Sequence, residues 1–119
     1  MSGIVFFGTA DRSRVVAFYT DRLGFEVWLE QSGCTILRHD NLLVGFCDRE
    51  QAETEGVVTL VEATRAAVDD RYRALADVAR DEPTENEAYR IYQFFADDPD
   101  GRTLEVQTFL HPTDPPIEG

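Results

Sequence analysis

The hydrophobic pattern in the first half of the chain predicts one strand, one helix and three further strands. Residues 3–9 (GIVFFGT) combine β-branched and aromatic side chains with the period of two that a strand requires. Asp11 has the chemistry of a helix N-cap, and apolar residues recur after it at helical spacing until Gly24 ends the helix. The expected extended segments after this helix are 25–30, 34–39 and 41–47, with turns at 31–33 and 39–41. The order up to residue 47 is therefore βαβββ.

A second pattern of the same kind follows a polar connecting segment at 48–55. Residues 56–62 predict a strand, and Thr64 can cap a helix with Asp69 and Arg73 paired on its solvent face. The apolar stripe of this helix comprises Val68, Tyr72, Leu75, Ala76 and Ala79. The elements expected after it are a loop or weak edge strand at 81–86, a hairpin of strands 88–96 and 102–109, and an irregular tail from His111.

The two halves of the chain repeat each other at an offset of 53 residues. The matching positions are Gly3, Ile4, Val5, Asp11, Arg12, Val15 and Tyr19 in the first half and Gly56, Val57, Val58, Thr64, Arg65, Val68 and Tyr72 in the second. Because the match covers strand, cap and buried helix face, it indicates a structural repeat. Two sheets that each bury one face under a helix leave their helix-free faces to enclose a cavity, within one chain or shared between two.

Composition and charge narrow the class of protein. A chain of 119 residues with 43% hydrophobic content is expected to form one domain, residues 1–119, with modules at about 3–47 and 56–109. The net charge of -12 argues against binding nucleic acid or an anionic membrane. Every basic residue other than histidine is Arg, and acidic residues outnumber them 23 to 11. This acidity favours adaptation to high salt over attraction of a cationic ligand, although both interpretations remain open.

The expected location is the cytoplasm. No apolar run approaches the ~18 residues that a membrane-spanning helix needs, and the N-terminus lacks a basic-then-apolar signal pattern. Two cysteines, Cys34 and Cys47, are too few for a disulfide scaffold or a cysteine-rich zinc site. A hairpin that turns at Asp40 and Asn41 would place them directly opposite each other, and we interpret them as small buried residues in preference to a redox pair.

The final hairpin carries the most informative acidic residue. Glu105 stands among Leu104, Val106 and Phe109, on a strand that should be largely buried, so its charge requires a metal, a partner or a ligand. The turn before it contains Asp97, Asp98 and Asp100, separated by Pro and Gly, and is interpreted as a solvated turn. No phosphate-binding loop, CxxC, GxSxG or HExxH motif is present.

Two motifs together resemble the glyoxalase / bleomycin-resistance / ring-cleaving dioxygenase superfamily, also called vicinal oxygen chelate proteins. They are residues 18–25 (FYTDRLGF) at the helix end and residues 98–105 (DPDGRTLE), within a likeness that spans residues 3–109. The resemblance implies an α+β fold of paired βαβββ modules, in which a curved mixed sheet forms a cavity. In many members that cavity holds one divalent metal, bound by His, Gln or Glu on the first and last strands of each module.

This sequence departs from the metal-binding pattern that the resemblance implies. The corresponding positions are Ile4, Val57, about Gly45, and Glu105, and of these only Glu105 can coordinate a metal. Divalent metals need three or more protein ligands to be held well. His39 lies in a predicted turn and His111 follows the last strand, so neither can replace a ligand within this chain. His111 could still reach the cavity of a neighbouring subunit.

The function that these observations favour is metal-free binding or sequestration of a small molecule, as in bleomycin-resistance proteins, by a homodimer. The candidate ligand-binding residues are Ile4, Phe6, Trp28, Val57, Thr59, Thr103, Glu105 and Gln107. Trp28 is expected on one strand face with Glu26 and Glu30, at a cavity mouth, an interface or a rim. The alternatives are a metal-dependent lyase, isomerase or dioxygenase, and a metal-free enzyme with Glu105 as general base. A pocket filled by Phe6 and Trp28 would instead indicate a purely structural member.

Overall fold

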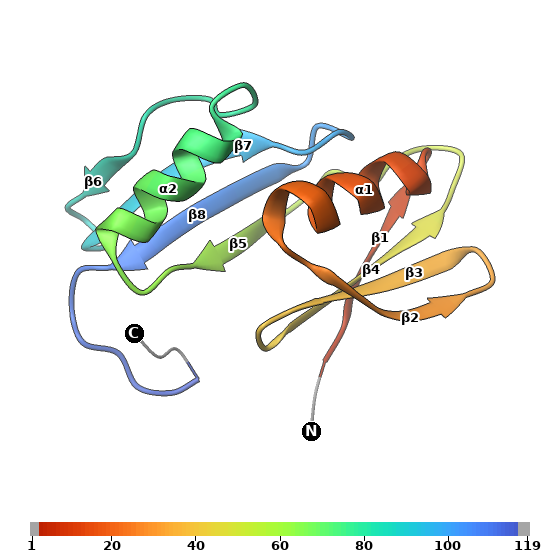
Figure 1. Ribbon diagram of the computed structural model, residues 1–119, viewed down its shortest axis with the longest axis horizontal. Helices are drawn as coiled ribbons and strands as arrows, with labels where there is room; N and C mark the ends of the chain where they lie inside the picture. The colour runs from red at the N-terminus through yellow and green to blue at the C-terminus, as the bar shows by residue number, and fades with distance from the viewer. Residues whose placement is uncertain (1–2, 117–119) are drawn as a thin grey trace. The chain divides into compact units, whose positions relative to one another are not determined.

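The computed structural model describes residues 3–116 and shows two compact units (Figure 1). The first contains the residues up to Glu55 together with Pro99–Gly101, and the second contains the other residues from Gly56 onward. Each unit consists of a four-stranded mixed sheet and one principal helix, so the protein has an α+β fold. Apart from residues 99–101, each unit corresponds to one copy of the repeat, and each copy builds a sheet of its own.

The first module has the predicted βαβββ order. Its elements are β1 (Val5–Thr9), α1 (Arg12–Leu23), β2 (Glu26–Gln31), β3 (Cys34–His39) and β4 (Leu42–Asp48), and its strand order is β1-β4-β3-β2. The Asp11 carboxylate accepts a hydrogen bond from the Arg14 backbone N–H at 3.2 Å, which confirms the N-cap. Gly24 ends α1 with a φ of 76°, a left-handed conformation that favours glycine.

The core of the first module lies between α1 and the sheet. The face of α1 that is buried carries Val15, Phe18, Tyr19 and Leu23. The Tyr19 ring centroid lies 4.9 Å from that of Phe46 on β4 and 5.3 Å from that of Phe25. Tyr19 is fully buried, as predicted for a core residue, and burying a side chain of this kind contributes about 1.5–3 kcal/mol.

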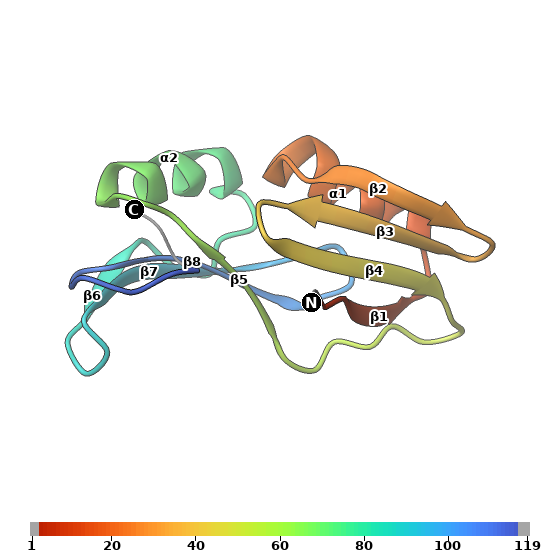
Figure 2. The same cartoon turned by 90° about the horizontal axis from the view of Figure 1, so that it is seen from below.

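The second module repeats the arrangement. Its elements are β5 (Val57–Val61), α2 (Arg65–Leu75), β6 (Thr84–Asn86), β7 (Ile91–Asp97) and β8 (Thr103–Phe109), in the strand order β5-β8-β7-β6. Thr64 caps α2 by accepting the Ala67 N–H at 3.1 Å. The helix covers one face of this sheet (Figure 2), and β6 is the short edge strand that the sequence indicated. Among the described residues of this module, none forms a helix on the other face of the sheet.

Helix α2 ends at Leu75, earlier than the apolar stripe predicted, so Ala79 is not part of it. The Arg80 N–H donates to the Phe95 carbonyl at 2.8 Å, and the Asp97 N–H donates to the Val78 carbonyl at 3.0 Å. Ala79 also forms an isolated bridge with Ala96 of β7. The small side chains let this segment approach the sheet, and backbone hydrogen bonds to β7 replace those of a longer helix.

The predicted ion pair between Asp69 and Arg73 is wrong. Asp69 accepts a hydrogen bond from the Tyr92 hydroxyl at 2.6 Å, and Arg73 pairs with Asp70. Tyr92 lies on the helix-facing side of β7, where its hydroxyl reaches the first half of α2. The hydrogen bond to Asp69 raises the pKa of Tyr92 above its usual range, and partial burial raises it further.

The turn between β7 and β8 is held by a buried ion pair, which corrects the prediction that its aspartates are all solvated. Arg102 Nη1 lies 2.5 Å from Asp98 Oδ2, and both side chains are fully buried. The Arg102 backbone N–H also donates to Asp98 Oδ1 at 2.9 Å, and the Asp98 N–H donates to the Arg102 carbonyl. Asp97 pairs instead with Arg80 at the surface. The guanidinium of Arg102 is the compensation that a buried aspartate requires.

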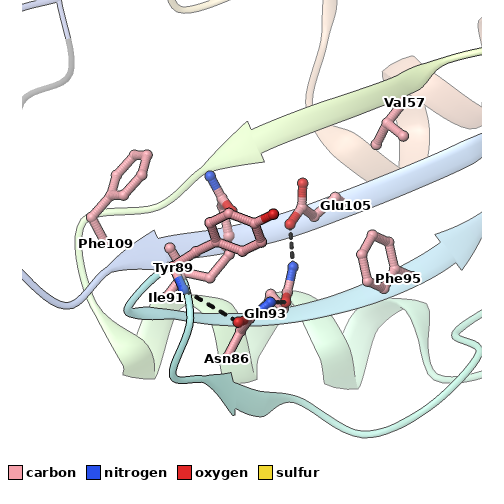
Figure 3. Close-up of a pocket in the computed structure, with 9 residues that line it drawn as sticks. Val57, Asn86, Tyr89, Ile91, Gln93, Phe95, Glu105 and Phe109 are labelled. Carbon is pink, nitrogen blue, oxygen red and sulfur yellow. Dashed lines mark hydrogen bonds between the residues drawn. The ribbon is translucent and has the colours of Figure 1, made fainter.

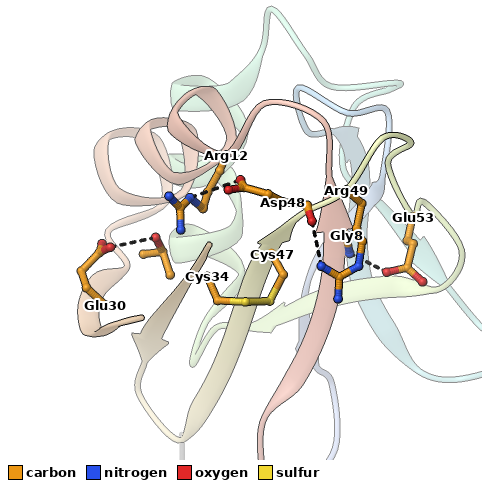
Figure 4. The surroundings of a disulfide bond; sticks show 9 residues. Gly8, Arg12, Glu30, Cys34, Cys47, Asp48, Arg49 and Glu53 are labelled. Atoms are coloured by element: carbon orange, nitrogen blue, oxygen red, sulfur yellow. Dashed lines mark hydrogen bonds and ion pairs between the residues drawn. A yellow bond between two sulfur atoms is a disulfide. The ribbon is translucent and has the colours of Figure 1, made fainter. Parts of the chain in front are cut away.

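A disulfide joins Cys34 and Cys47, so the interpretation of two unlinked buried residues is wrong (Figure 4). The hairpin turns at Asp40 and Asn41, which makes the two cysteines direct partners in the β3–β4 register, as predicted. Directly opposed residues project to the same side of a sheet, so the sulfur atoms can meet. Disulfides persist mainly in oxidising compartments, and this bond therefore gives no support to the expected cytoplasmic location.

Within the part of the chain that the structure describes, neither helix is long and apolar enough to cross a membrane.

Candidate functional site

The helix-free face of the second sheet presents the candidate functional side chains. Alternation along β8 turns Leu104 and Val106 into the core under α2 and leaves Glu105 and Gln107 on the opposite face. On β5, directly beside β8, the same alternation places Thr59 opposite Glu105. The period of two thus gathers polar groups from two neighbouring strands on one face of the sheet.

A pocket of about 520 Å³ opens on this face (Figure 3). Its apolar walls come from Val57, Tyr89, Ile91, Phe95 and Phe109. Its polar groups are the side chains of Asn86, Gln93, Glu105 and Gln107. The volume lies within the range typical of small-molecule sites, and so does the combination of apolar walls with a few polar groups.

Among the described residues that line the pocket, Glu105 is the only charged one, and it is half-buried. The Thr59 hydroxyl donates to Glu105 Oε1 at 2.9 Å. The Gln93 side-chain amide donates to Glu105 Oε2, and Asn86 Nδ2 donates to Gln93 Oε1 at 3.0 Å. Both carboxylate oxygens thus accept a hydrogen bond from a neutral group, and each keeps a lone pair for a ligand.

The structure gathers five of the predicted site residues in the second module, of which three line the pocket. Val57, Glu105 and Gln107 are the three lining residues. Thr59 supports the carboxylate through its hydrogen bond. Thr103 instead accepts a hydrogen bond from Arg80 at 2.9 Å and does not line the pocket. Ile4, Phe6 and Trp28 belong to the first module and do not line it either.

In the first module the position that corresponds to Glu105 is Gly45. Phe6 on β1 pairs with Gly45 on β4. In the second module, Thr59 on β5 pairs with Glu105 on β8 in the same way. A Cβ atom on Gly45 would lie only 2.4 Å from the Phe6 ring. The ring therefore occupies the space above Gly45 that a longer side chain would fill. This half of the repeat offers an aromatic surface, with Phe6 about half exposed, in place of a polar group.

Trp28 does not share a strand face with both Glu26 and Glu30, contrary to the prediction. Glu26 pairs with Arg38 and Glu30 pairs with Thr35, and these two partners lie on opposite faces of β3. The register shifts between Val27 and Leu29, so Trp28 is the extra residue of a β-bulge. A bulge breaks the period of two, and the Trp28 side chain is 50% exposed.

Six lining residues were not predicted as site residues: Asn86, Tyr89, Ile91, Gln93, Phe95 and Phe109. A signal for Gln93 and Phe95 existed, because the turn between Asp97 and Thr103 pairs Phe95 with Glu105 and Gln93 with Gln107. Tyr89 gave no such signal, since it lies in the loop after β6. There its backbone N–H donates to the Asn86 side-chain oxygen at 3.3 Å.

The donor set does not fit a divalent metal held as the resemblance implies. Ile4, Val57 and Gly45 have no side-chain lone pair, and Glu105 alone remains. Residues 3–116 contain no cluster of three or more His, Cys, Asp or Glu side chains that could hold a metal ion. His39 packs its ring 5.0 Å from Phe25, and His111 Nδ1 lies 3.0 Å from the Pro112 carbonyl oxygen. Such metals require three or more protein ligands.

Comparison with known proteins identifies the fold. No protein-family profile matches the sequence, and no curated protein matches it. Among solved structures, a glyoxalase/bleomycin resistance protein/dioxygenase from Nocardioides is 17% identical with a TM-score of 0.76, over 100% of this chain and 89% of that one. A glyoxalase/bleomycin resistance protein/dioxygenase family enzyme from Burkholderia phytofirmans is 21% identical with a TM-score of 0.78, over 90% of this chain and 97% of that one.

A lactoylglutathione lyase from Agrobacterium tumefaciens is 19% identical with a TM-score of 0.72, over 91% of this chain and 92% of that one. The chain therefore has the fold of the glyoxalase, bleomycin-resistance and dioxygenase proteins, as the two motifs and the repeat indicated. At these identities the likeness establishes the fold, and the choice among binding protein, lyase and dioxygenase depends on the residues of the site.

Proposed function

We propose that this protein binds or sequesters a small molecule without a metal, as bleomycin-resistance proteins do, and that the pocket of the second module holds the ligand. The observation that carries the proposal is the composition of the pocket. Apolar side chains form its walls, and Glu105 and Gln107 supply polar groups. The positions that would supply further metal ligands are Ile4, Val57 and Gly45, so the carboxylate serves as an anchor for a ligand.

The side-chain amides of Asn86, Gln93 and Gln107 provide local reporters for a direct test. We expect a library of small apolar compounds with cationic, neutral and anionic head groups to contain members that shift these amide signals saturably in ¹⁵N-labelled protein. Val57→Trp should abolish the shifts, because the new ring enters the pocket. Ala66→Trp adds the same bulk to the exposed face of α2 and should leave them intact. Shifts that persist in Val57→Trp, or a library with no active member, would contradict the proposal.

The competing function, a metal-dependent lyase, isomerase or dioxygenase, is separated by elemental analysis of the purified protein. We expect no stoichiometric Mn, Fe, Ni or Zn, because one carboxylate is too small a ligand set. Near-stoichiometric metal in the native protein, lost in Glu105→Gln, would favour the enzyme and overturn the proposal. Glu87→Gln serves as the control, because it removes an equal charge from an exposed residue that does not line the pocket.

A further inference from the structure

We infer that the ligand of the second-module pocket is an organic cation, namely a protonated amine or quaternary ammonium group on an apolar body. This inference rests on the proposed binding function and specifies the chemical class of its ligand. It follows from three features of the pocket: one uncompensated carboxylate, aromatic rings on three different segments, and a hydrogen-bond chain that fixes the carboxylate in place.

The charge of Glu105 has no counter-ion among the residues that the structure describes. Its carboxylate accepts hydrogen bonds from the hydroxyl of Thr59 and the side-chain amide of Gln93, and neither group carries a charge. None of the residues that line the pocket is an Arg or a His. The carboxylate would repel an anionic ligand. A neutral ligand would displace water from the carboxylate and leave its negative charge uncompensated. A cationic head group compensates the charge as it binds.

Aromatic residues from three segments share the pocket with this carboxylate. Phe95 is the direct partner of Glu105 in the β7–β8 register, and Tyr89 reaches the pocket from the loop after β6. In the view of Figure 3, the Glu105 side chain lies between Tyr89 and Phe95, with Phe109 beyond Tyr89. The faces of such rings attract cations, and more strongly when the cation loses its water. A pocket that combines aromatic walls with a single carboxylate suits an alkylammonium group better than a small hydrated ion.

Tyr89 shows that part of this aromatic surface lacks a covering group in the free protein. Tyr89 is 71% exposed, the largest exposed fraction among the large hydrophobic residues described. Its backbone is nevertheless anchored, because the Tyr89 N–H donates to Asn86 at 3.3 Å. The ring is thus held beside the pocket while most of its surface remains available to a ligand with an apolar body.

The hydrogen-bond chain keeps the carboxylate fixed in the absence of a ligand. Asn86 donates to the oxygen of the Gln93 amide, which turns the NH₂ group of Gln93 toward Glu105. Thr59 holds the other carboxylate oxygen from the neighbouring strand. Because the acceptor is already oriented, a cation that enters does not have to order it, and this preorganisation favours binding.

The test compares three probes that share one skeleton and differ in charge at neutral pH: 4-phenylbutylammonium, 4-phenylbutan-1-ol and 4-phenylbutanoate. Their Kd values are measured from the side-chain amide shifts of Gln93 and Gln107. We expect the ammonium to bind at least about tenfold more tightly than the alcohol and the carboxylate to bind most weakly. Glu105→Gln should reduce the preference for the ammonium over the alcohol to about twofold or less. Glu87→Gln, which removes an equal charge outside the pocket, should leave the preference unchanged.

The aromatic contribution is tested separately with Tyr89→Leu, which keeps an apolar side chain and removes the ring. We expect it to weaken ammonium binding about threefold or more and to change the Kd of the alcohol much less. Circular dichroism of each variant establishes that it is folded. Thr59→Val gives a second, milder test of the carboxylate, because it removes one hydrogen bond to Glu105 and leaves the charge in place. It should reduce the preference for the ammonium less than Glu105→Gln does.

The outcomes separate this inference from the proposed function. If the alcohol binds as tightly as the ammonium, or the carboxylate binds best, the pocket binds small molecules but the cation inference is wrong. If Glu105→Gln keeps the full preference for the ammonium, the carboxylate does not select charge and the inference is also wrong. If none of the three probes shifts any pocket signal, the cation inference is overturned, and the library experiment then decides the proposed function on its own.

Discussion

At the scale of single residues, one pair of strand positions explains why the two modules differ in chemistry. Thr59 and Glu105 occupy the same register in the second module as Phe6 and Gly45 in the first. The second module therefore presents a hydroxyl and a carboxylate where the first presents a ring over a glycine. Each pair of residues fits together within its module. The Thr59 hydroxyl donates a hydrogen bond to the Glu105 carboxylate, and Gly45 leaves room for the Phe6 ring.

Gly45→Ala tests the close approach of the Phe6 ring. A Cβ atom at this position would lie 2.4 Å from ring carbons, so the ring must move, and we expect a loss of about 1 kcal/mol in the free energy of unfolding. In a Phe6→Ala background the obstacle is absent, and the same substitution should be neutral or slightly stabilising, since Ala is ordered in a strand at a lower entropic cost than Gly. Urea unfolding of the four proteins measures the coupling. Equal effects of Gly45→Ala in both backgrounds would contradict the contact.

Tyr92 should show a pH-dependent contribution to stability. The hydrogen bond to Asp69 raises the pKa of Tyr92 in the folded protein above its value of about 10 in the unfolded chain. Between these two pKa values the folded protein binds more protons, so the contribution is fully present below pH ~10 and is lost as pH rises through the folded pKa.

The measurement compares wild type with Tyr92→Phe. At pH 7 the variant should lose about 1 kcal/mol of unfolding free energy, because Asp69 loses its donor. The difference absorbance at 295 nm between the two proteins should show a tyrosine that ionises above pH ~10. A difference titration at or below the value for free tyrosine would contradict the assignment, as would equal stability of the two proteins at neutral pH.

At the scale of elements, the buried pair of Asp98 and Arg102 should decide whether the β7–β8 hairpin forms. Asp98→Ala takes the carboxylate away from a fully buried guanidinium, and we expect it to cost about 3–5 kcal/mol. The single variant Arg102→Met and the double variant Asp98→Ala/Arg102→Met complete the comparison. The double variant removes both charges, so its loss of unfolding free energy should be smaller than the sum of the losses in the two single variants. Arg80→Gln, which breaks the exposed pair with Asp97, is the matched control and should cost less than about 1 kcal/mol. Urea denaturation measures all four, and additive losses would contradict a coupled pair.

Features of the elements that depend on local sequence were predictable, and features that depend on distant contacts were not. The caps Asp11 and Thr64, the glycine after α1 and the two-residue turn at 40–41 are local signals, and the structure confirms each of them. The bulge at Trp28 and the end of α2 at Leu75 depend on backbone contacts with distant strands. Period-two and period-3.6 patterns contain no information about such contacts, and both predictions therefore failed at these points.

At the scale of the whole molecule, the repeat and the two motifs were sufficient to predict the fold, whereas the site was predicted only in part. Glu105, Val57 and Gln107 could be found because they lie on strands whose alternation is regular. Asn86 and Tyr89 could not be found, because Asn86 is the last residue of a short edge strand and Tyr89 lies in the loop after it. The disulfide was missed although its register was predicted, since a pair of opposed cysteines does not reveal its oxidation state in the sequence.

The net charge of -12 makes a prediction about the entire chain. Carboxylates that repel one another destabilise the folded state, and salt screens this repulsion as the Debye length falls from about 10 Å at 0.1 M to about 3 Å at 1 M. We expect the melting temperature to rise steeply up to about 0.5 M NaCl and then to level off. The rise should be about 4 °C for each kcal/mol of repulsion that the salt relieves. Adaptation to high salt predicts this curve, and an acidic surface that serves only to attract a ligand does not require it.

A charge-reduced variant separates screening from general effects of salt on folding. Asp81→Asn, Glu82→Gln and Glu87→Gln together remove three exposed carboxylates from the segment between α2 and β7 and change the net charge from -12 to -9. This variant should melt at a higher temperature than wild type in 0.05 M NaCl and should gain less from added salt. The two curves should converge near 1 M, where the charges no longer interact over more than a few ångströms. A melting temperature that is independent of salt, or parallel curves for the two proteins, would show that repulsion among these carboxylates does not limit stability.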